Sequence, residues 1–291
     1  MPFRSFTGGV EGGKAVAVLA AKRLRSVDPM ETSGHAATIA LDDANLELLV
    51  SQISESIFGD AGRRCVSNRV LLVHKHFAQV VAHIKQRAEA IVMGDPMDPK
   101  TEMGPVITKK SREEIHYMVS ETAKQIGREP LTGGQIDPRP GYFYPPTIFT
   151  NVPENAVAMK QEIFGPVLVI NELQGKNREE ALWNGIELVN KSRYGLSNAL
   201  FTNDRRLSML AKAHIKTGAL HIDKAPHGSE GGKYFGGCKD SGWGYEGKGL
   251  DWCTRPMQFY DDYLDEVRPV PAEKIANAQK LISESKSPLE K

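Results

Sequence analysis

The sequence has no long apolar run, no excess of either charge and very little cysteine. Its longest purely apolar stretch, residues 15–21, is far shorter than the roughly 18 residues of a membrane span. The 37 Lys and Arg side chains balance 36 Asp and Glu, so no strong field favours a nucleic acid or a membrane surface. The first residues, MPFRSFTGG, lack the layout of a signal peptide. We therefore expect neither a membrane nor a nucleic-acid partner.

The three cysteines, Cys65, Cys238 and Cys253, are odd in number and match no metal-ligand spacing. They fit reduced thiols better than a disulfide framework. A chain of 291 residues, 40% hydrophobic and 25% charged, is typical of a globular protein with one large domain or two ordinary ones. The composition thus predicts a soluble cytoplasmic protein without a metal centre.

Helical and strand patterns alternate along the chain. Residues 3–6 predict a strand, the glycine-rich residues 8–13 a turn, and residues 14–24 a helix. Apolar residues at helical spacing predict three more helices, around residues 77–91, 181–189 and 207–215, the last ending at Gly218. Short β-rich runs predict strands at residues 69–73, 166–170, 198–202 and 219–223. This alternation favours an α/β fold with a largely parallel sheet.

Three stretches depart from this alternation. Residues 93–107 are dense in Pro and Gly and predict an ordered surface loop. Residues 228–249 are rich in glycine and predict a long loop, which in a compact domain is usually functional. Residues 272–285 near the polar C-terminus favour a short helix or a frayed end.

The motif FTGGVEGG places Gly8, Gly9 and Gly13 between a predicted strand and a predicted helix. Unpaired N–H groups at a helix start, together with the helix dipole, suit a phosphate group. A tight strand-to-helix turn without a ligand explains the same motif, so the motif alone does not decide between the two.

Cys65 follows two arginines, Arg63 and Arg64, just before a predicted strand. Nearby cations favour the thiolate, which is the nucleophilic form of cysteine. A buried structural cysteine is the alternative. Glu31 stands 34 residues earlier, in METSGH, and is a candidate base, although a lone Glu is usually surface charge.

Two further patterns leave the chemistry open. The histidines have no metal-ligand spacing, and one of them could pair with Cys65 as in a hydrolase, but nothing singles one out. Glu162 stands immediately before an apolar strand in QEIFGPVLVI, where an ordinary turn is an equal explanation.

Taken together and in this order, these segments resemble the second half of an NAD(P)-dependent aldehyde dehydrogenase. FTGGVEGG is similar to that family's FTGS-x-x-x-G cofactor turn, METSGH to its E-L-G-G-K segment, and GDAGRRCVSNRVLLV to its G-Q-x-C segment. Five later landmarks follow in sequence order: GDPMDPKTEMGPVI, GYFYPPTIFTNV, QEIFGPVLVI, YGLSNALFTND and YFGGCKDSGWG. The resemblance covers about residues 6–260, and it implies the family's fold.

The resemblance also implies roles for individual residues. Cys65 would attack an aldehyde as a thiolate, its own N–H would help hold the oxyanion, and Glu31 would activate the water that hydrolyses the thioester. Gly8, Gly9 and Gly13 would approach the phosphates of NAD or NADP. Glu162 would hold the nicotinamide ribose, and Phe164 would pack near the nicotinamide ring. The glycine-rich loop would line the aldehyde tunnel.

The sequence departs from the family pattern at several of these positions. Gly9 replaces a Ser, Arg63 replaces a Gln, and Thr32, Ser33 and His35 replace Leu, Gly and Lys beside Glu31. These changes predict a site that differs from the standard one.

A full-length family member has roughly as much chain again before its FTGS segment. The resemblance therefore implies four parts: a remnant of the Rossmann-like cofactor domain (1–30), the catalytic domain (31–250), a returning strand for oligomerisation (251–267, near 257–263), and a polar tail (268–291). We expect such a chain to act as a homo-oligomer or with a complementing N-terminal half, because an open strand edge and exposed apolar surface favour association.

Three hypotheses follow for the function. The first is an aldehyde dehydrogenase that oxidises a small-molecule aldehyde to a carboxylic acid. The second is a catalytically silent fragment that only associates with full-length subunits. The third is a cofactor-free thiol esterase that uses Cys65.

Overall fold

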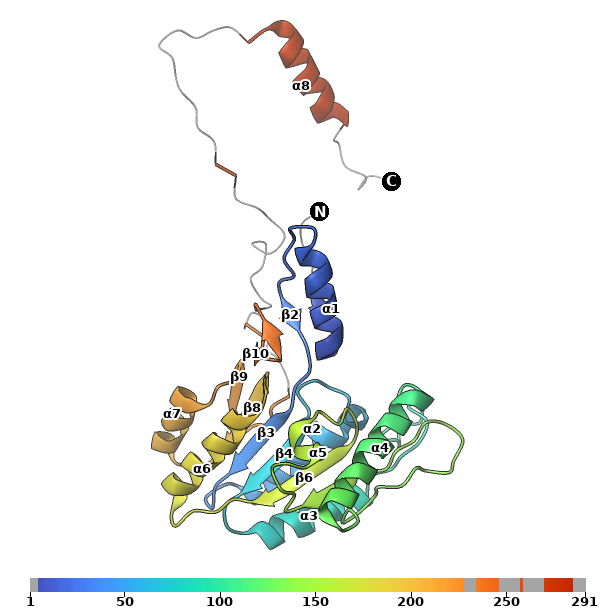
Figure 1. The fold of residues 1–291 in the computed structure, drawn as a ribbon, viewed down its shortest axis with the longest axis vertical. Coiled ribbons are helices and arrows are strands. Elements are labelled where there is room, and N and C mark those ends of the chain that lie inside the picture. The colour runs from blue at the N-terminus through green and yellow to red at the C-terminus, as the bar shows by residue number, and fades with distance from the viewer. Residues whose placement is uncertain (1–4, 228–233, 246–256, 259–269, 285–291) are drawn as a thin grey trace. The chain divides into compact units, whose positions relative to one another are not determined.

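The computed structural model describes residues 5–227, 234–245, 257–258 and 270–284. The chain forms two compact units, Met1–Trp252 and Cys253–Lys291. In the second unit the described part holds one helix, α8 (Ala272–Glu284), as predicted (Figure 1). Of the expected returning strand only Met257 and Gln258 are described, neither of them in a strand, and Cys253 lies outside the described residues. The proposed boundary at residue 30 stays a prediction.

The larger sheet of the first unit has six strands in the order β5-β6-β4-β3-β8-β9, and every neighbouring pair is parallel. The strands are β3 (Ala36–Ala40), β4 (Asn68–Val73), β5 (Thr147–Thr150), β6 (Val167–Glu172), β8 (Ser197–Phe201) and β9 (Ala219–Ile222). β3, β4 and β8 are buried along their whole length. Such burial requires helices on both faces of the sheet. The predicted α/β fold with a parallel sheet is confirmed.

Six helices surround this sheet (Figure 1): α2 (Leu46–Phe58), α3 (Phe77–Glu89), α4 (Lys109–Ile126), α5 (Val157–Lys160), α6 (Arg178–Lys191) and α7 (Arg205–His214). From β3 through α2 to β4 the chain moves along the sheet toward β5. Through α5, α6 and α7 it moves toward β9. Right-handed crossovers therefore place α2 on one face and the other three on the opposite face. The three helices predicted from periodicity correspond to α3, α6 and α7.

α2 and α4 were not among the predicted helices, although both have the caps of ordinary helices. Asn45 caps α2 by accepting a hydrogen bond from the N–H of Leu48 at 3.0 Å. Buried apolar residues recur every four positions along α2: Leu49, Ile53 and Ile57. α4 begins after Thr108, which accepts from the N–H of Ser111, and ends at Gly127 in the left-handed conformation.

Two predicted helix bounds are wrong. The first helix, α1 (Val10–Ala21), begins inside the glycine run, because Gly9 serves as its N-cap and Gly12 and Gly13 are helical. α7 ends at His214 and not at Gly218, since Ile215 turns to an extended conformation and packs into the core. Residues 93–107 form the predicted loop, without a helix or strand.

A smaller sheet lies beside the large one within the first unit. It joins β1 (Phe6–Thr7), β2 (Met30–Glu31) and β11 (Gly242–Trp243), with β2 in the middle. A further antiparallel pair joins β7 (Tyr194–Gly195) to β10 (Cys238–Lys239). The described part of the predicted glycine-rich loop, residues 234–245, therefore pairs with the small sheet through β11 and with β7 through β10. No described helix is both long and apolar enough to cross a bilayer.

Candidate active site

Three segments from different parts of the chain converge around Cys65. Glu31 ends β2 of the small sheet and is buried, Cys65 is half-buried three residues before β4, and Glu162 stands before β6. Burial, then the negative charges of Glu162 and Glu31, raise the pKa of the Cys65 thiol. Both carboxylates are therefore close enough for their charge to affect the ionisation of the Cys65 thiol. The structure brings together the three site residues that the sequence placed far apart.

Two glycines allow this convergence. A Cβ on Gly34 would lie 2.1 Å from the carbonyl oxygen of Cys65, so only glycine lets the Cys65 loop approach the segment after Glu31. Gly62 has φ +67°, and a Cβ there would lie 2.2 Å from the carbonyl oxygen of Gly165. The Cys65 loop is thus in direct backbone contact with the segments that carry both carboxylates.

Arg69, a buried arginine at the start of β4, holds the same loop by hydrogen bonds to its backbone. One guanidinium nitrogen donates to the carbonyls of Gly62 at 2.7 Å and Gly165 at 2.9 Å, and the other donates to the carbonyl of Arg64 at 3.1 Å. The same group lies 3.6 Å from a carboxylate oxygen of Glu162. The sequence analysis did not single out Arg69. A charged residue inside the apolar run NRVLLV was the available signal, because a buried charge needs partners.

The expectation that Arg63 and Arg64 would favour the thiolate is wrong. Arg63 donates to the carbonyl of Phe164 at 3.2 Å and lies over its ring, while Arg64 pairs with Asp60 at 2.5 Å. Neither guanidinium is among the groups that shift the pKa of Cys65. Burial and the two carboxylates raise that pKa. The backbone N–H of Cys65 and the positive charge of Arg69 lower it, but by less.

Glu162 and Phe164 both contact Arg69, which also holds the Cys65 loop. Burial raises the pKa of Glu162, against the opposing effects of Arg69 and of hydrogen bonds from Ser33 and Gly34. The Phe164 ring has Arg63 at 4.8 Å and Arg69 at 5.5 Å from its centroid. Their roles toward a nicotinamide ribose and ring stay predictions.

The substituted segment after Glu31 is held by the glycine-rich loop. The Thr32 hydroxyl donates to the carbonyl of Asp240, and the Thr32 N–H donates to the carbonyl of Ser241 at 3.1 Å. The Ser241 hydroxyl donates to the carbonyl of Ser33 at 2.7 Å and accepts from the N–H of Gly195 at 3.0 Å. Ser241 therefore links the segment after Glu31 to β7.

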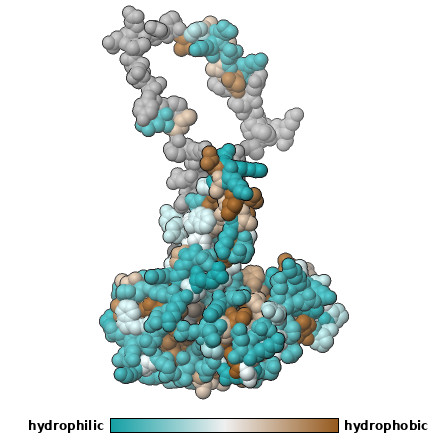
Figure 2. All heavy atoms as spheres, in the orientation of Figure 1, coloured by the Kyte–Doolittle hydropathy of each residue, from teal (hydrophilic) through white to brown (hydrophobic). Residues whose placement is uncertain are grey.

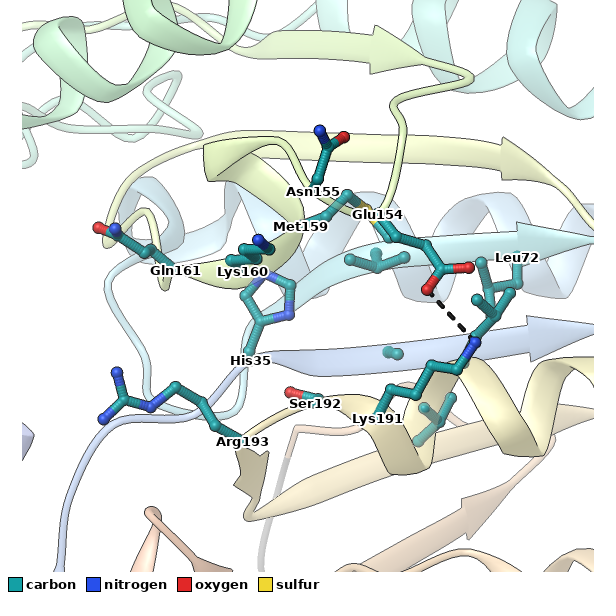
Figure 3. Close-up of a pocket in the computed structure, with 14 residues that line it drawn as sticks. His35, Leu72, Glu154, Asn155, Met159, Lys160, Gln161, Lys191, Ser192 and Arg193 are labelled. Carbon is teal, nitrogen blue, oxygen red and sulfur yellow. Dashed lines mark hydrogen bonds and ion pairs between the residues drawn. The ribbon is translucent and has the colours of Figure 1, made fainter. Parts of the chain in front are cut away.

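His35 is buried and closes the other side of this segment. Its Nε2 lies 3.1 Å from the carbonyl oxygen of Ala158. Burial lowers the pKa of His35 from 6.5 to about 4, so the imidazole is neutral at physiological pH. A pocket of about 530 Å³ lies beyond His35 and is lined by neither Cys65 nor Glu31 (Figure 3).

The predicted phosphate turn has the geometry of a helix start. Gly9 is the N-cap of α1, has no side-chain cap, and has open space where a Cβ would be. Its first turn carries one acidic residue, Glu11, whose charge is shared with Lys14 at 2.9 Å. The N–H groups of this turn fit an anionic group. No group of three metal-ligating side chains occurs among the described residues.

A model of the aldehyde dehydrogenase family matches residues 2–258. The chain belongs to the aldehyde dehydrogenase family. It is 36% identical over 244 residues to a 3-sulfolactaldehyde dehydrogenase of Priestia megaterium, covering 84% of this chain and 48% of that protein. It is 33% identical over 241 residues to the succinate semialdehyde dehydrogenase Sad of Escherichia coli, covering 82% of this chain and 50% of that protein.

Solved structures of aldehyde dehydrogenases share this fold. A lactaldehyde dehydrogenase from Escherichia coli superimposes with a TM-score of 0.79 at 29% identity, over 85% of this chain and 51% of that one. A betaine aldehyde dehydrogenase from Staphylococcus aureus, solved in complex with NAD⁺, gives 0.78 at 30% identity, over 84% and 48%. The chain thus spans about half the length of the relatives that it matches.

Proposed function

We propose that this chain carries the nucleophile and the base for oxidation of an aldehyde to a carboxylic acid with NAD⁺ or NADP⁺. The observation that carries the proposal is the backbone contact at Gly34 and Gly62, which brings Cys65 together with Glu31 and Glu162. Similarity to aldehyde and semialdehyde dehydrogenases supports it. We assign the complete activity to an assembly, either a homo-oligomer or a complex with an N-terminal half.

Cys65 acts first in this scheme. Its thiolate sulfur forms a bond to the aldehyde carbon, and the carbonyl electrons move to oxygen, next to the N–H of Cys65 itself. Gly8, Gly9, Gly13, Glu162 and Phe164 would hold the dinucleotide, whose nicotinamide would supply the acceptor for the hydride that the adduct on Cys65 loses on becoming a thioester. Glu31 then takes a proton from a water molecule, whose oxygen attacks the thioester carbon. The carbon–sulfur bond breaks, the acid leaves, and Cys65 is again a thiolate.

After burial, the charge of Glu162 has the largest effect on how readily Cys65 ionises. Its charge is the larger of the two carboxylate effects that raise the pKa of the thiol, and its own pKa is raised by burial. A proton held on Glu162 removes this negative charge and favours the thiolate. We therefore place Glu162 as a group that tunes Cys65, in addition to the ribose contact that the family resemblance implies.

The glycine turn before α1 is where we place the dinucleotide phosphates. Gly8, Gly9 and Gly13 offer backbone without side chains at the positive end of a helix of 12 residues. We place the nicotinamide end at Phe164 and Glu162, as the family resemblance implies. The identity of the cofactor, NAD or NADP, and of the aldehyde depends on contacts outside these residues.

Association without catalysis is the second candidate function, and one observation favours it. Val18 and Leu19 on α1 are 55% and 62% exposed, and Figure 2 shows apolar side chains gathered over this helix. An exposed apolar face of this kind is typical of a contact surface. A silent subunit would keep this face and have no use for the Cys65 geometry.

The test is to trap the thioester. The full chain is incubated with NAD⁺ or NADP⁺ and a panel of semialdehydes, alone and with a separately expressed N-terminal half of a relative, and intact mass is followed. We expect an acyl adduct on Cys65, absent in Cys65→Ser, that accumulates several-fold in Glu31→Gln because hydrolysis slows. Equal adduct lifetimes in the wild type and Glu31→Gln would remove Glu31 as the base. Absence of any adduct in both settings would leave the association function.

A further inference from the structure

The pocket beyond His35 lies between α5 and α6, over the middle of the large sheet (Figure 3). Its volume of about 530 Å³ is in the range of small-molecule sites. Strands β3 and β4 form its floor with Ala37, Val70 and Leu72, and α6 adds Leu188 and Val189 as a wall. The interior is predominantly apolar, so it suits a hydrocarbon chain.

His35 forms the inner end of the pocket without bringing a charge into it. Its ring is buried against the carbonyl of Ala158, and its lowered pKa keeps it neutral. The deep part of the pocket therefore offers no ionic partner. Any charged group of a ligand has to lie at the rim.

The rim carries three cations, of which two already have carboxylate partners. Lys191 lies 3.4 Å from Glu154, as drawn in Figure 3, and Arg193 lies 2.5 Å from Asp240. Lys160, at the end of α5, makes no ion pair with any residue that the structure describes. The rim thus has one cation whose charge is not shared.

We propose that this pocket binds a small amphipathic carboxylate, with its acid group at Lys160 and its hydrocarbon chain on the floor of β3 and β4. A charge-assisted contact at the rim and apolar burial inside are complementary to such a molecule and to neither a sugar nor a polyanion. The site is separate from Cys65, which does not line the pocket. It does not depend on the proposed dehydrogenase activity.

Octanoate titrated into the full 291-residue chain in a calorimeter is the test. We expect saturable binding that is retained in Cys65→Ala, because the ligand is not at the thiol. Leu188→Trp fills the pocket from the α6 wall and is expected to abolish binding, with circular dichroism showing that the fold is kept. Lys160→Glu is expected to weaken octanoate about tenfold by replacing an attraction with a repulsion.

Two controls separate this site from general surface binding. Lys212→Glu makes the same charge change on α7, away from the pocket, and is expected to leave octanoate binding unchanged. Octan-1-ol, which has the chain without the charge, is expected to bind equally to the wild type and Lys160→Glu. Absence of saturable octanoate binding, its loss in Cys65→Ala, its persistence in Leu188→Trp, or an equal loss in Lys160→Glu and Lys212→Glu would each overturn the proposal.

Discussion

The two sheets of this chain differ in how much core supports them. One hydrophobic cluster joins all six strands of the large sheet with the helices on both of its faces. Among the residues that the structure describes, the small sheet and α1 share a cluster of three buried residues, Ala20, Val27 and Met30. Cys65 and Glu162 belong to the first region, whereas Glu31 belongs to the second.

The candidate site therefore combines residues from a region with a large hydrophobic core and from a region with a small one. Cys65 is held by a buried arginine and by tight backbone contacts, which a large core can stabilise. Glu31 lies on a strand of two residues, whose position relative to Cys65 depends on Gly34 and on the hydrogen bonds of Thr32 and Ser241. Changes in the large region should therefore be costly, and changes on α1 should be mild.

The largest effect is expected from Arg69. Replacing Arg69 by Met leaves Glu162 and three carbonyl groups without their buried donor, and we expect a loss of about 3–5 kcal/mol in the free energy of unfolding. Arg69→Lys should lose less, since the charge remains. Urea unfolding measures both, with Arg206→Met, which removes an exposed pair with Glu179, as the control expected to change little. Equal costs for Arg69→Met and Arg206→Met would show that the large region does not depend on this group.

A somewhat smaller loss is expected for Gly62→Ala. Its Cβ would meet the backbone of Gly165, and the left-handed φ adds strain, so we expect about 3 kcal/mol. Gly127→Ala is a matched control, because Gly127 has φ +69° with open space around it and should cost only about 1 kcal/mol. Thermal unfolding measures the stability of both variants. Gly127→Ala adds backbone strain alone, whereas Gly62→Ala adds strain and a steric clash with Gly165. If the two variants lose the same stability, the close approach of the Cys65 loop is not needed.

His35, at the entrance to β3, makes stability depend on pH. The unfolded chain binds a proton at this residue below about pH 6.5, but the fold does so only below about 4. Stability is therefore full above pH 6.5 and falls as the pH drops toward 4, by up to about 3 kcal/mol. His35→Gln can keep a donor to Ala158 and should lose this part of the pH dependence. His83→Gln, on the exposed face of α3, should retain the pH dependence of stability. Urea titrations from pH 4 to 7 measure it for both variants, and an equal pH dependence in both would contradict the role of His35.

The smallest effect on stability is expected on α1. Leu19→Lys replaces an exposed side chain and should change the free energy of unfolding by no more than about 0.5 kcal/mol. If the α1 face is a contact surface, the same variant should lower self-association in analytical ultracentrifugation. Met209→Lys, equally exposed on α7, is the control with the same charge change. A large loss of stability in Leu19→Lys would mean that α1 has more support than its small cluster provides.

The sequence was informative wherever a pattern is local. Alternating helix and strand signals gave the parallel α/β fold, and the order of short motifs gave the family and the candidates Cys65, Glu31 and Glu162. Helix caps and apolar spacing also encode α2 and α4, although neither was among the predicted helices. The exact ends of α1 and α7 depended on Gly9 and Ile215, whose conformations are set by their neighbours in space.

Only the tertiary structure decided the electrostatics of the site. Arg63 and Arg64 adjoin Cys65 in the sequence, yet their side chains turn to Phe164 and Asp60, and the thiol instead senses Glu162 and Glu31. The central position of Arg69 likewise arises from carbonyls of three separate residues. The sequence by itself determined the order of strands and helices and, through its resemblance to a family, the candidates Cys65, Glu31 and Glu162, because short motifs and periodicity are local. Their ionisation and contacts were decided by folding, because burial and charge act through space between residues far apart along the chain.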